Sequence, residues 1–294
     1  MRSSGPTPGG CSIGEEVRLG QNFLADPNLL SAILADAALE PTDVVLEVGG
    51  GEGVLTERLA GRVSDLHVVE LDERLRDPLE RVASAHPGMS LIFGDAMRID
   101  LSALAPPPTA MVANLPYSIA TPLILRTIAD LDSIRRWTVM VQREIAERLR
   151  ARPGSKTYGS PSVLVQLACD VRMLRAVDPA VFTPRPRVES AVLALRRRAK
   201  APPEPVRVLI RDCFAHRRKA LPRSLEAAAR RREGEAERAG LPPPRPRSAE
   251  VRHHARESLA ALGLPVDARA EMLPPPMHLA LAERILEGST TDAS

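Results

Sequence analysis

The sequence predicts an α/β fold, in which a doubly wound, mostly parallel sheet ends in an antiparallel hairpin and is followed by a small C-terminal α-helical domain. Short apolar runs alternate with amphipathic segments between residues 43 and 142, which is typical of a parallel sheet covered by helices. Two more strand-like runs precede residue 200, and from Ala201 onward the sequence is helical in pattern, rich in arginine and punctuated by proline. With 294 residues, of which 44% are hydrophobic, the chain can bury the core of such a fold.

The individual elements follow in a regular order. A first helix is expected from Asp26, a capping residue, and Pro27, which suits the first helical position, through Leu39. Amphipathic segments such as LTERLAGRV separate five expected strands, at residues 43–48, 65–70, 89–95, 109–114 and 137–142. The helices REIAERLRA and SPSVLVQLA then lead to ACDVRML and VESAVLALRR, which we expect to form the antiparallel pair at the end of a mixed sheet.

Composition divides the chain into three parts. Residues 1–18 are expected to be a flexible N-terminus, residues 19–199 to form the sheet domain, and residues 200–294 to form the helical domain. Within the last part, VRVLIRDCFAHRRKALPRSLEAAARRREGEAERAG is helical in pattern, and LPPPRPRSAE is expected to be a loop before two or three further short helices. The boundary near residue 200 rests on the shift from strand-like to helical sequence.

Composition also excludes several classes of protein. No run reaches the roughly 18 apolar residues of a transmembrane helix, and the N-terminus lacks the apolar segment of a secretory signal, so we expect a cytoplasmic protein. The three cysteines are isolated and the six histidines form no H-E-x-x-H pattern, so we expect free thiols and no metal site. The formal net charge is +3, and all but three of the 40 basic residues are arginines. Arginine binds phosphate well, but its abundance alone indicates nucleic acid only weakly.

A glycine-rich loop follows the first expected strand. Residues 47–53 read EVGGGEG, where missing side chains let backbone amides and the following helix N-terminus approach a ligand. A nicotinamide-type G-x-G-x-x-G that starts at Gly49 requires glycine at position 54, which is Val54. The spacing E-x-G-x-G-x-G instead favours S-adenosylmethionine, with a structural turn or another nucleotide site as the alternatives.

Two acidic residues close the next two strands. Glu70 lies seventeen positions after Gly53, where a carboxylate accepts hydrogen bonds from both hydroxyls of a ribose. Asp95 ends the third strand, from which it could accept a hydrogen bond from an adenine amino group. Either acid alone is most simply a solvated residue at a strand end. Because both are in register with the glycine loop, they favour a cofactor site.

The fourth strand ends in Asn114, followed by Leu115, Pro116 and Tyr117. An exocyclic amine such as adenine N6 is a poor nucleophile, since its lone pair is delocalised into the ring, so it needs acceptors around its hydrogens. The Asn114 side-chain oxygen and the Leu115 carbonyl can supply them, with Pro116 fixing the corner and Tyr117 offering a stacking surface for the base. The alternative is an ordinary β-turn with a buried tyrosine.

The motifs LGQNFL, EVGGGEGVLT, VVELD, GDAM, NLPY, VQREIAERL, FTPRPRVESAV and FAHRRKALPRSL occur here in this order. They resemble the KsgA family of ribosomal RNA adenine dimethyltransferases over about residues 18–230 and again from ARAEML to the final helix. The resemblance implies a Rossmann-like, S-adenosylmethionine-dependent methyltransferase sheet. It further implies dimethylation of N6 of two adjacent adenosines near the 3′ end of 16S rRNA, within a pre-30S ribosomal particle, and a role in ribosome assembly.

The resemblance also implies roles for particular residues. The residues expected at S-adenosyl-L-methionine are Asn22, Leu24, Gly49, Gly51, Glu70, Asp95 and Asn114. The expected catalytic pocket for the target base is formed by Asn114, Leu115, Pro116 and Tyr117, with Phe182 as the opposing face. The residues expected to contact RNA are Arg143, Lys156, Arg185, Arg187, Arg217, Arg218 and Lys219. We expect a monomer without a metal ion.

The sequence departs from the family pattern at three places. GGGEG replaces the common GPGxG, YGSPSV stands where YGRLSV is usual, and the proline-rich stretch near residues 241–247 looks like an insertion. An erythromycin-resistance type enzyme acting on 23S rRNA shares most motifs, and FAHRRKALPRSL favours the small-subunit enzymes over it. Protein glutamine methyltransferases carry N-P-P-Y rather than N-L-P-Y, and a non-enzymatic assembly factor on the same fold is expected to lose the acceptors of the base pocket.

Overall fold

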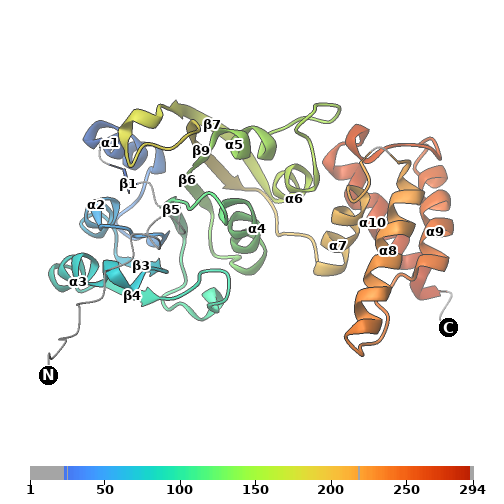
Figure 1. The fold of residues 1–294 in the computed structure, drawn as a ribbon, viewed down its shortest axis with the longest axis horizontal. Coiled ribbons are helices and arrows are strands. Elements are labelled where there is room, and N and C mark those ends of the chain that lie inside the picture. The colour runs from blue at the N-terminus through green and yellow to red at the C-terminus, as the bar shows by residue number, and fades with distance from the viewer. Residues whose placement is uncertain (1–22, 25, 218, 292–294) are drawn as a thin grey trace, which may run out of the picture.

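The computed structural model describes residues 23–24, 26–217 and 219–291, arranged as a sheet lobe and a helical lobe (Figure 1). The expected flexible segment 1–18, together with Asn22 and Arg218, lies outside these residues. Seven strands form the main sheet in the order β4-β3-β2-β5-β6-β9-β7. Their bounds are Val44–Val48 (β2), Asp65–Glu70 (β3), Met89–Phe93 (β4), Ala110–Asn114 (β5), Arg136–Gln142 (β6), Cys169–Val177 (β7) and Ser190–Arg197 (β9).

The strand directions confirm the predicted mixed sheet. Strand β2 pairs in parallel with β3 and β5, and the neighbouring pairs β3–β4 and β5–β6 are parallel as well. Strand β9 runs antiparallel to both β6 and β7, which is the expected hairpin at the sheet edge. All five strands expected between residues 43 and 142 form, with bounds that differ by no more than two residues at either end.

Helices cover both faces of the sheet, because side chains alternate between the faces along each strand. On one face, α4 (Ala120–Asp130), α5 (Arg143–Leu149) and α6 (Ser160–Ala168) pack on a core that includes Leu46 of β2. On the other face, α1 (Pro27–Ala37), α2 (Val54–Ala60) and α3 (Arg76–Ala85) pack on a core that includes the adjacent Val45. The alternation of Val45 and Leu46 thus produces the doubly wound arrangement.

The first helix begins as the sequence predicts. The Asp26 carboxylate accepts hydrogen bonds from the backbone amides of Asn28 and Leu29, at 2.7 and 2.9 Å, and Pro27 follows as the first helical residue. A side-chain cap of this kind satisfies amides that have no partner within the helix.

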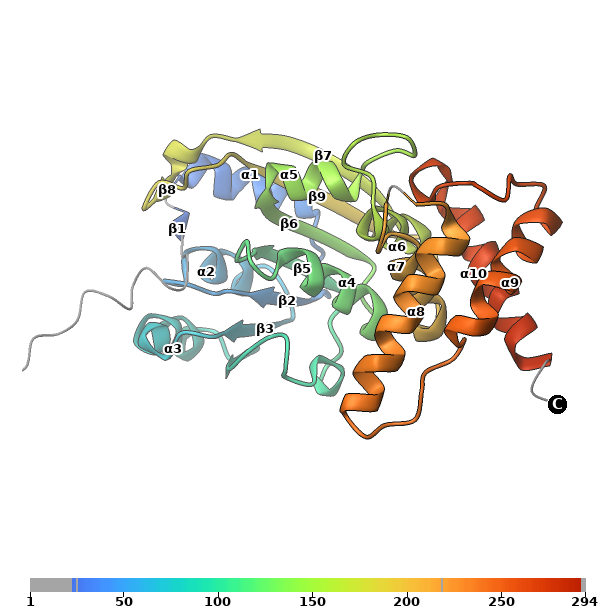
Figure 2. The ribbon, with the colours of Figure 1, turned by 45° about the vertical axis from the view of Figure 1, so that its right-hand side comes forward.

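The helical lobe consists of α7 (Glu204–Cys213), α8 (Leu221–Arg238), α9 (Ser248–Ala261) and α10 (Pro275–Thr291). Its buried core also includes Tyr158, Val163 and Leu164, which precede the expected boundary at residue 200. The hydroxyl of Tyr158 donates a hydrogen bond to the backbone carbonyl of Leu273 at 2.8 Å. Figure 2 shows α6 between the sheet and the helices of this lobe, so the two lobes share a packed junction.

Some elements were not predicted from the sequence. Helix α4, the short helix η2 (Leu101–Ala103) and strand β1 (Phe23–Leu24) had no assignment from the sequence. The amphipathic segment ERLRDPLERVASA, expected to be helical, begins as the short helix η1 (Glu73–Leu75) and continues as α3. The segment DPAVFTPRPR, expected to be a loop, contains the short helix η3 (Pro179–Val181) and strand β8 (Phe182–Thr183), which forms a small antiparallel ladder with β1. The short helix η4 (Ala270–Met272) lies in the region where short helices were expected. The long helical segment expected from residue 206 is interrupted between α7 and α8. The loop expected at LPPPRPRSAE ends at residue 247, because the last three residues of that stretch already belong to α9.

In the part of the chain that the structure describes, no helix is long and apolar enough to cross a membrane. Within the same residues, no group of three or more histidine, cysteine or acidic side chains is arranged to hold a metal ion. Cys169 and Cys213 are buried free thiols, and Cys11 lies outside the described residues.

Candidate active site

The candidate site lies where the order of strands reverses. The chain runs from β2 outward to β3 and β4, then returns to the other side of β2 for β5 and β6, so a crevice opens at the carboxyl ends of β2 and β5. A pocket occupies this place. The described residues that line it are Phe23, Leu24, Glu47, Gly49, Gly50, Gly51, Glu52, Val54, Leu55, Glu70, Asn114, Leu115, Pro116 and Tyr117.

The pocket brings together most of the residues predicted for cofactor and base. Leu24, Gly49, Gly51, Glu70 and the four residues 114–117 all line it, although they come from four separate stretches of sequence. Gly49, Gly51, Glu70 and residues 114–117 converge because parallel strands deliver their carboxyl ends to one edge of the sheet, whereas Leu24 reaches the pocket from β1.

The glycine loop is shaped by its backbone. Gly49, Gly51 and Gly53 have φ angles of +84°, +57° and +85°, a left-handed conformation that strains any residue with a Cβ atom. A Cβ atom at Gly49 would lie 3.5 Å from the carbonyl oxygen of Asn114, so the loop packs directly against the Asn-Leu-Pro-Tyr corner. At Gly50 a Cβ atom would lie 2.7 Å from Cγ1 of Val68, and the absence of a side chain there suits the packing.

Glu70 is held rigidly at the end of β3. Its Oε2 accepts a hydrogen bond from the amide of Gly51 at 2.9 Å, and its Oε1 accepts from the amides of Leu71 and Asp72 at 2.8 and 2.9 Å. The residue is only 5% exposed. Three backbone donors therefore fix the carboxylate in the pocket wall and tie the glycine loop to the neighbouring strand.

Glu47 lines the same pocket and was not among the predicted site residues. It is 1% exposed, and its Oε2 has no hydrogen-bond partner among the described residues. Burial raises the pKa of its carboxyl from 4.5 to about 8, a hydrogen bond from Thr56 opposes this, and the nearby Glu70 raises it further. The signal was present in the sequence, as the glutamate that opens E-x-G-x-G-x-G.

The Asn-Leu-Pro-Tyr corner is anchored at both ends. Asn114 is the last residue of β5, and the amide of Leu115 donates a hydrogen bond to the carbonyl of Met140 on β6 at 3.0 Å. At the other end, the amide of Ile119 donates to the carbonyl of Pro116 at 3.2 Å. The hydroxyl of Tyr117 lies 2.7 Å from the hydroxyl of Ser190, so its ring position is fixed from the antiparallel hairpin.

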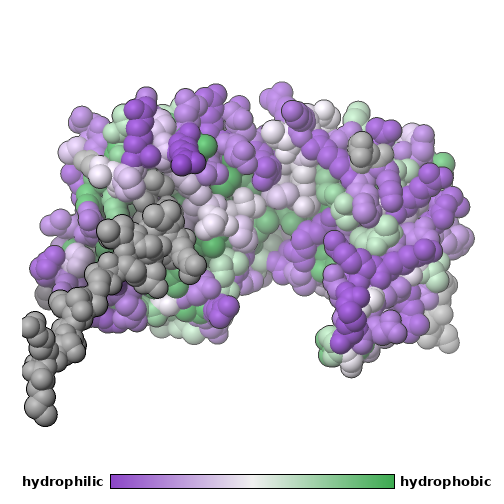
Figure 3. Space-filling model, in the orientation of Figure 1, coloured by the Kyte–Doolittle hydropathy of each residue, from purple (hydrophilic) through white to green (hydrophobic). Residues whose placement is uncertain are grey.

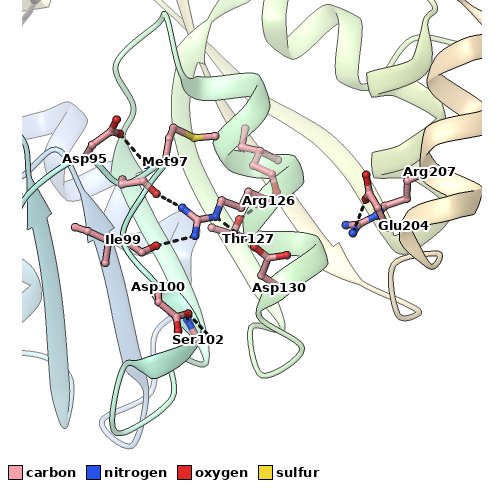
Figure 4. A network of polar contacts seen from close by, with 12 residues as sticks. Asp95, Met97, Ile99, Asp100, Ser102, Arg126, Thr127, Asp130, Glu204 and Arg207 are labelled. Atoms are coloured by element: carbon pink, nitrogen blue, oxygen red, sulfur yellow. Dashed lines mark hydrogen bonds and ion pairs between the residues drawn. The ribbon is translucent and has the colours of Figure 1, made fainter. Parts of the chain in front are cut away.

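Two of the described residues that were predicted for the cofactor or the base do not line this pocket. Phe182 is 3% exposed, pairs with Leu24 in the β1–β8 ladder and packs in the core beside α1. Asp95 follows β4, where its Oδ1 accepts a hydrogen bond from the amide of Met97 at 2.8 Å. Arg126 on α4 donates hydrogen bonds to the carbonyls of Ala96 and Ile99, both at 2.6 Å, and so holds this turn against the helix. Figure 4 shows Arg126 between α4 and the turn.

The predicted RNA-binding residues fall into two groups. Arg143, Arg185 and Arg187 lie near the carboxyl edge of the sheet, where Arg143 forms ion pairs with Glu147 and Glu189 at 2.9 and 2.6 Å. Lys156, Arg217 and Lys219 lie at the junction with the helical lobe. The surface in Figure 3 is hollowed between the two lobes, and hydrophilic side chains cover the helical side of the hollow.

Arg217 makes contacts within the protein. Its Nε donates to Oε2 of Glu271 at 2.7 Å, and its terminal nitrogens donate to the carbonyls of Ser155, at 2.9 Å, and Lys156. The side chain thus joins the loop before α8 to the loop before α6. This junction places the exposed side chains of Lys156 and Lys219 on neighbouring loops.

Several known proteins are similar to this chain in sequence. "Ribosomal RNA small subunit methyltransferase A" of Rubrobacter xylanophilus is 42% identical over 282 residues, which cover 95% of this chain and 98% of that protein. The protein of the same name in Rhodospirillum rubrum is 39% identical over 273 residues, covering 91% of this chain and 86% of its own length.

Two solved structures share the fold. A dimethyladenosine transferase from Plasmodium falciparum superposes with a TM-score of 0.73 and 23% identity, covering 90% of this chain and 98% of that one. The 23S rRNA methyltransferase ErmE superposes with a TM-score of 0.60 and 28% identity, covering 90% of this chain and 99% of that one. Methyltransferases of this fold imply an S-adenosylmethionine-type cofactor. The sequence model of the family described as "Ribosomal RNA adenine dimethylase" matches residues 15–241, and the chain therefore belongs to the ribosomal RNA adenine dimethylase family.

Proposed function

We propose that the protein transfers methyl groups from S-adenosyl-L-methionine to N6 of two adjacent adenosines near the 3′ end of 16S rRNA, within a pre-30S ribosomal particle. The observation that carries this proposal is the convergence of the glycine loop, Glu70 and the Asn-Leu-Pro-Tyr corner in one pocket. The small-subunit substrate follows the names of the curated relatives at 42% and 39% identity. Such modification late in maturation would also make the protein a ribosome assembly factor.

In this proposal the cofactor, which supplies an activated methyl group, is held by Leu24, Gly49, Gly51, Glu70 and Asn114. The left-handed glycines bring backbone close to the ligand, and the Glu70 carboxylate accepts hydrogen bonds from ribose hydroxyls. Asp95 binds the adenine of the cofactor from the turn that Arg126 holds. Asn22, from outside the described residues, completes the set.

The amine of the target base is oriented by the corner at residues 114–117. Asn114 and the carbonyl of Leu115 accept its hydrogens, so that the lone pair points toward the methyl group. Tyr117 stacks on the base, and the contact with Ser190 holds the ring ready for it. Phe182 is proposed as the opposing face, although its side chain is buried in this structure, so stacking requires the β8 segment to move.

RNA recognition is proposed for both lobes. Residues 19–199 carry the methyl-transfer site, and residues 200–294 extend the surface that contacts the ribosomal particle. Lys156 and Lys219, with Arg218 from outside the described residues, supply cations at the junction, while Arg143, Arg185 and Arg187 supply them near the pocket. Arg217 supports this surface through its contacts with Glu271 and the loop before α6. We propose that the protein acts as a monomer in the cytoplasm.

A second candidate is methylation of 23S rRNA, which the likeness to ErmE at 28% identity favours. The two functions differ in the RNA that carries the product. Mapping N6,N6-dimethyladenosine in both rRNAs, from cells with and without the gene, tests them together. Loss of two adjacent dimethyladenosines from 16S rRNA is the expected result. Loss from 23S rRNA alone would support the second candidate, and unchanged rRNA would contradict both.

A further inference from the structure

The pocket is acidic in a protein that is otherwise rich in arginine. Glu47, Glu52 and Glu70 line it, and no lysine, arginine or histidine does so among the described lining residues. Across the whole chain, by contrast, 40 basic residues exceed 37 acidic ones. A pocket of this charge attracts a cationic ligand and disfavours ligands whose recognition depends on phosphate.

The two forms of the proposed cofactor differ in charge. S-adenosylmethionine has a sulfonium, an ammonium and a carboxylate, so its net charge is positive. After methyl transfer the sulfur is a neutral thioether, and S-adenosylhomocysteine has no net charge. A buried group whose ionisation responds to this difference can therefore distinguish substrate from product.

Glu47 is placed to respond in this way. It lies in the interior of the pocket wall on β2, with one buried carboxylate oxygen that has no hydrogen-bond partner among the described residues. The charged group that faces it is Glu70 on β3, and Thr56 on α2 offers a hydroxyl. An unpaired carboxylate is costly to bury, so the free protein favours the neutral acid, in agreement with a pKa raised to about 8.

We propose that Glu47 makes the site selective for the sulfonium cofactor over its thioether product, by losing a proton to water when the cation binds and regaining one after methyl transfer. This inference rests on the proposed function. In the transfer step the N6 lone pair forms the new N–C bond, the S–C bonding pair returns to sulfur, and the amine releases one proton to water. Glu47 then takes up a proton from water, because the positive charge that stabilised its carboxylate has gone.

The proposal predicts a pH-dependent preference between the two ligands. Binding that releases a proton strengthens as pH rises toward the pKa of the free group, whereas binding that leaves Glu47 neutral does not. The ratio of the dissociation constant for S-adenosylhomocysteine to that for S-adenosylmethionine should therefore increase about tenfold between pH 6.5 and 8. Above pH 8 the ratio should level off.

Calorimetry of the full chain without RNA tests this directly. Each ligand is titrated at pH 7 in two buffers of different ionisation enthalpy, which gives the number of protons released. Release of nearly one proton with S-adenosylmethionine and almost none with S-adenosylhomocysteine is expected. Glu47→Gln should abolish both this difference and the pH dependence of the ratio, while Glu57→Gln, an exposed control on α2, should behave as the wild type does.

Equal proton release with both ligands in the wild-type protein would overturn the proposal, whether or not the variant folds. Retention of the difference in a folded Glu47→Gln protein would overturn it as well. Failure of the wild-type protein to bind S-adenosylmethionine would instead refute the proposed cofactor, and the inference with it. The two failures are therefore distinguishable.

Discussion

The hydroxyl groups of Tyr117 and Ser190 lie 2.7 Å apart, although 73 positions separate the two residues in the chain. Ser190 is fully buried as the first residue of β9, where it pairs with Gln142 on β6 and with Val177 on β7. Two strands thus fix the serine, and the serine fixes the tyrosine ring beside the pocket. The antiparallel hairpin therefore takes part in shaping the proposed base site.

This contact predicts a graded effect of substitutions. Tyr117→Phe keeps the aromatic face and should retain most activity, whereas Tyr117→Ala should lose about 1 to 3 kcal/mol of base stacking. Ser190→Ala should weaken RNA binding modestly and leave cofactor affinity unchanged. In the Tyr117→Phe background, Ser190→Ala should have no further effect, because the hydroxyl that it contacts is absent. If the losses of activity from the two substitutions were additive in the double mutant, Ser190 would act independently of Tyr117.

Glu70 offers a test of the cofactor assignment. Glu70→Ala removes a charged acceptor from the proposed ribose site and should weaken S-adenosylmethionine binding by about 1 to 3 kcal/mol. It also leaves the amides of Gly51, Leu71 and Asp72 without their acceptor, so the melting temperature should fall. Calorimetry and thermal denaturation measure the two effects. Unchanged affinity in the folded variant would refute the role of Glu70.

Variants at the lobe junction can distinguish a residue that stabilises the structure from residues that contact RNA. Arg217→Lys preserves the charge but cannot reproduce three directed hydrogen bonds, so it should lower thermal stability more than it changes the salt dependence of RNA binding. Lys156→Ala and Lys219→Ala should do the opposite and flatten the plot of log affinity against log salt. The measurement is binding to ribosomal particles across a salt series. A salt slope that falls most with Arg217→Lys would reverse these assignments.

The sequence predicts the strands and the grouping of Gly49, Glu70 and Asn114, because parallel strands end at one edge and each motif follows a recognisable strand. It does not predict which side chains are buried by contacts with residues that are distant in the sequence. Phe182 pairs with Leu24 across the β1–β8 ladder, and a two-residue strand leaves no periodic pattern to detect. The charge run at residues 217–219 likewise gave no sign that Arg217 would bind Glu271.

The buried ring of His278 should make the folding stability of the helical lobe fall at acid pH. Burial lowers the pKa of its ring from 6.5 to about 4, and Nε2 lies 2.9 Å from the carbonyl oxygen of Ala270. Below pH 6.5 the unfolded chain binds a proton that the folded chain does not accept until about pH 4, so stability falls as pH drops through this window. The loss should approach about 3 kcal/mol at its largest.

Urea denaturation between pH 4.5 and 7.5 measures this effect. His278→Gln, which cannot titrate, should show a flatter decline in the free energy of unfolding than the wild type. His253→Gln removes an exposed histidine on α9 and serves as the matched control. Equal slopes for His278→Gln and the wild type would contradict the assignment.

Asn114 provides the most direct test of the chemistry. Asn114→Ala should reduce the rate of methyl transfer more than RNA affinity, because the lost acceptor matters most as positive charge develops on the attacking nitrogen. The first methylation does not end the need for orientation, since N6-methyladenine must return with its remaining hydrogen toward an acceptor. The Asn114→Ala variant should therefore accumulate the monomethyl product. Mass spectrometry of digested rRNA, after incubation with each variant, measures both products.

The control is Tyr117→Ala, which removes the stacking surface but keeps the hydrogen-bond acceptors. It should lower RNA affinity with less change in the ratio of monomethyl to dimethyl product. Dimethyladenosine formed by Asn114→Ala at the wild-type rate would exclude this role for the asparagine.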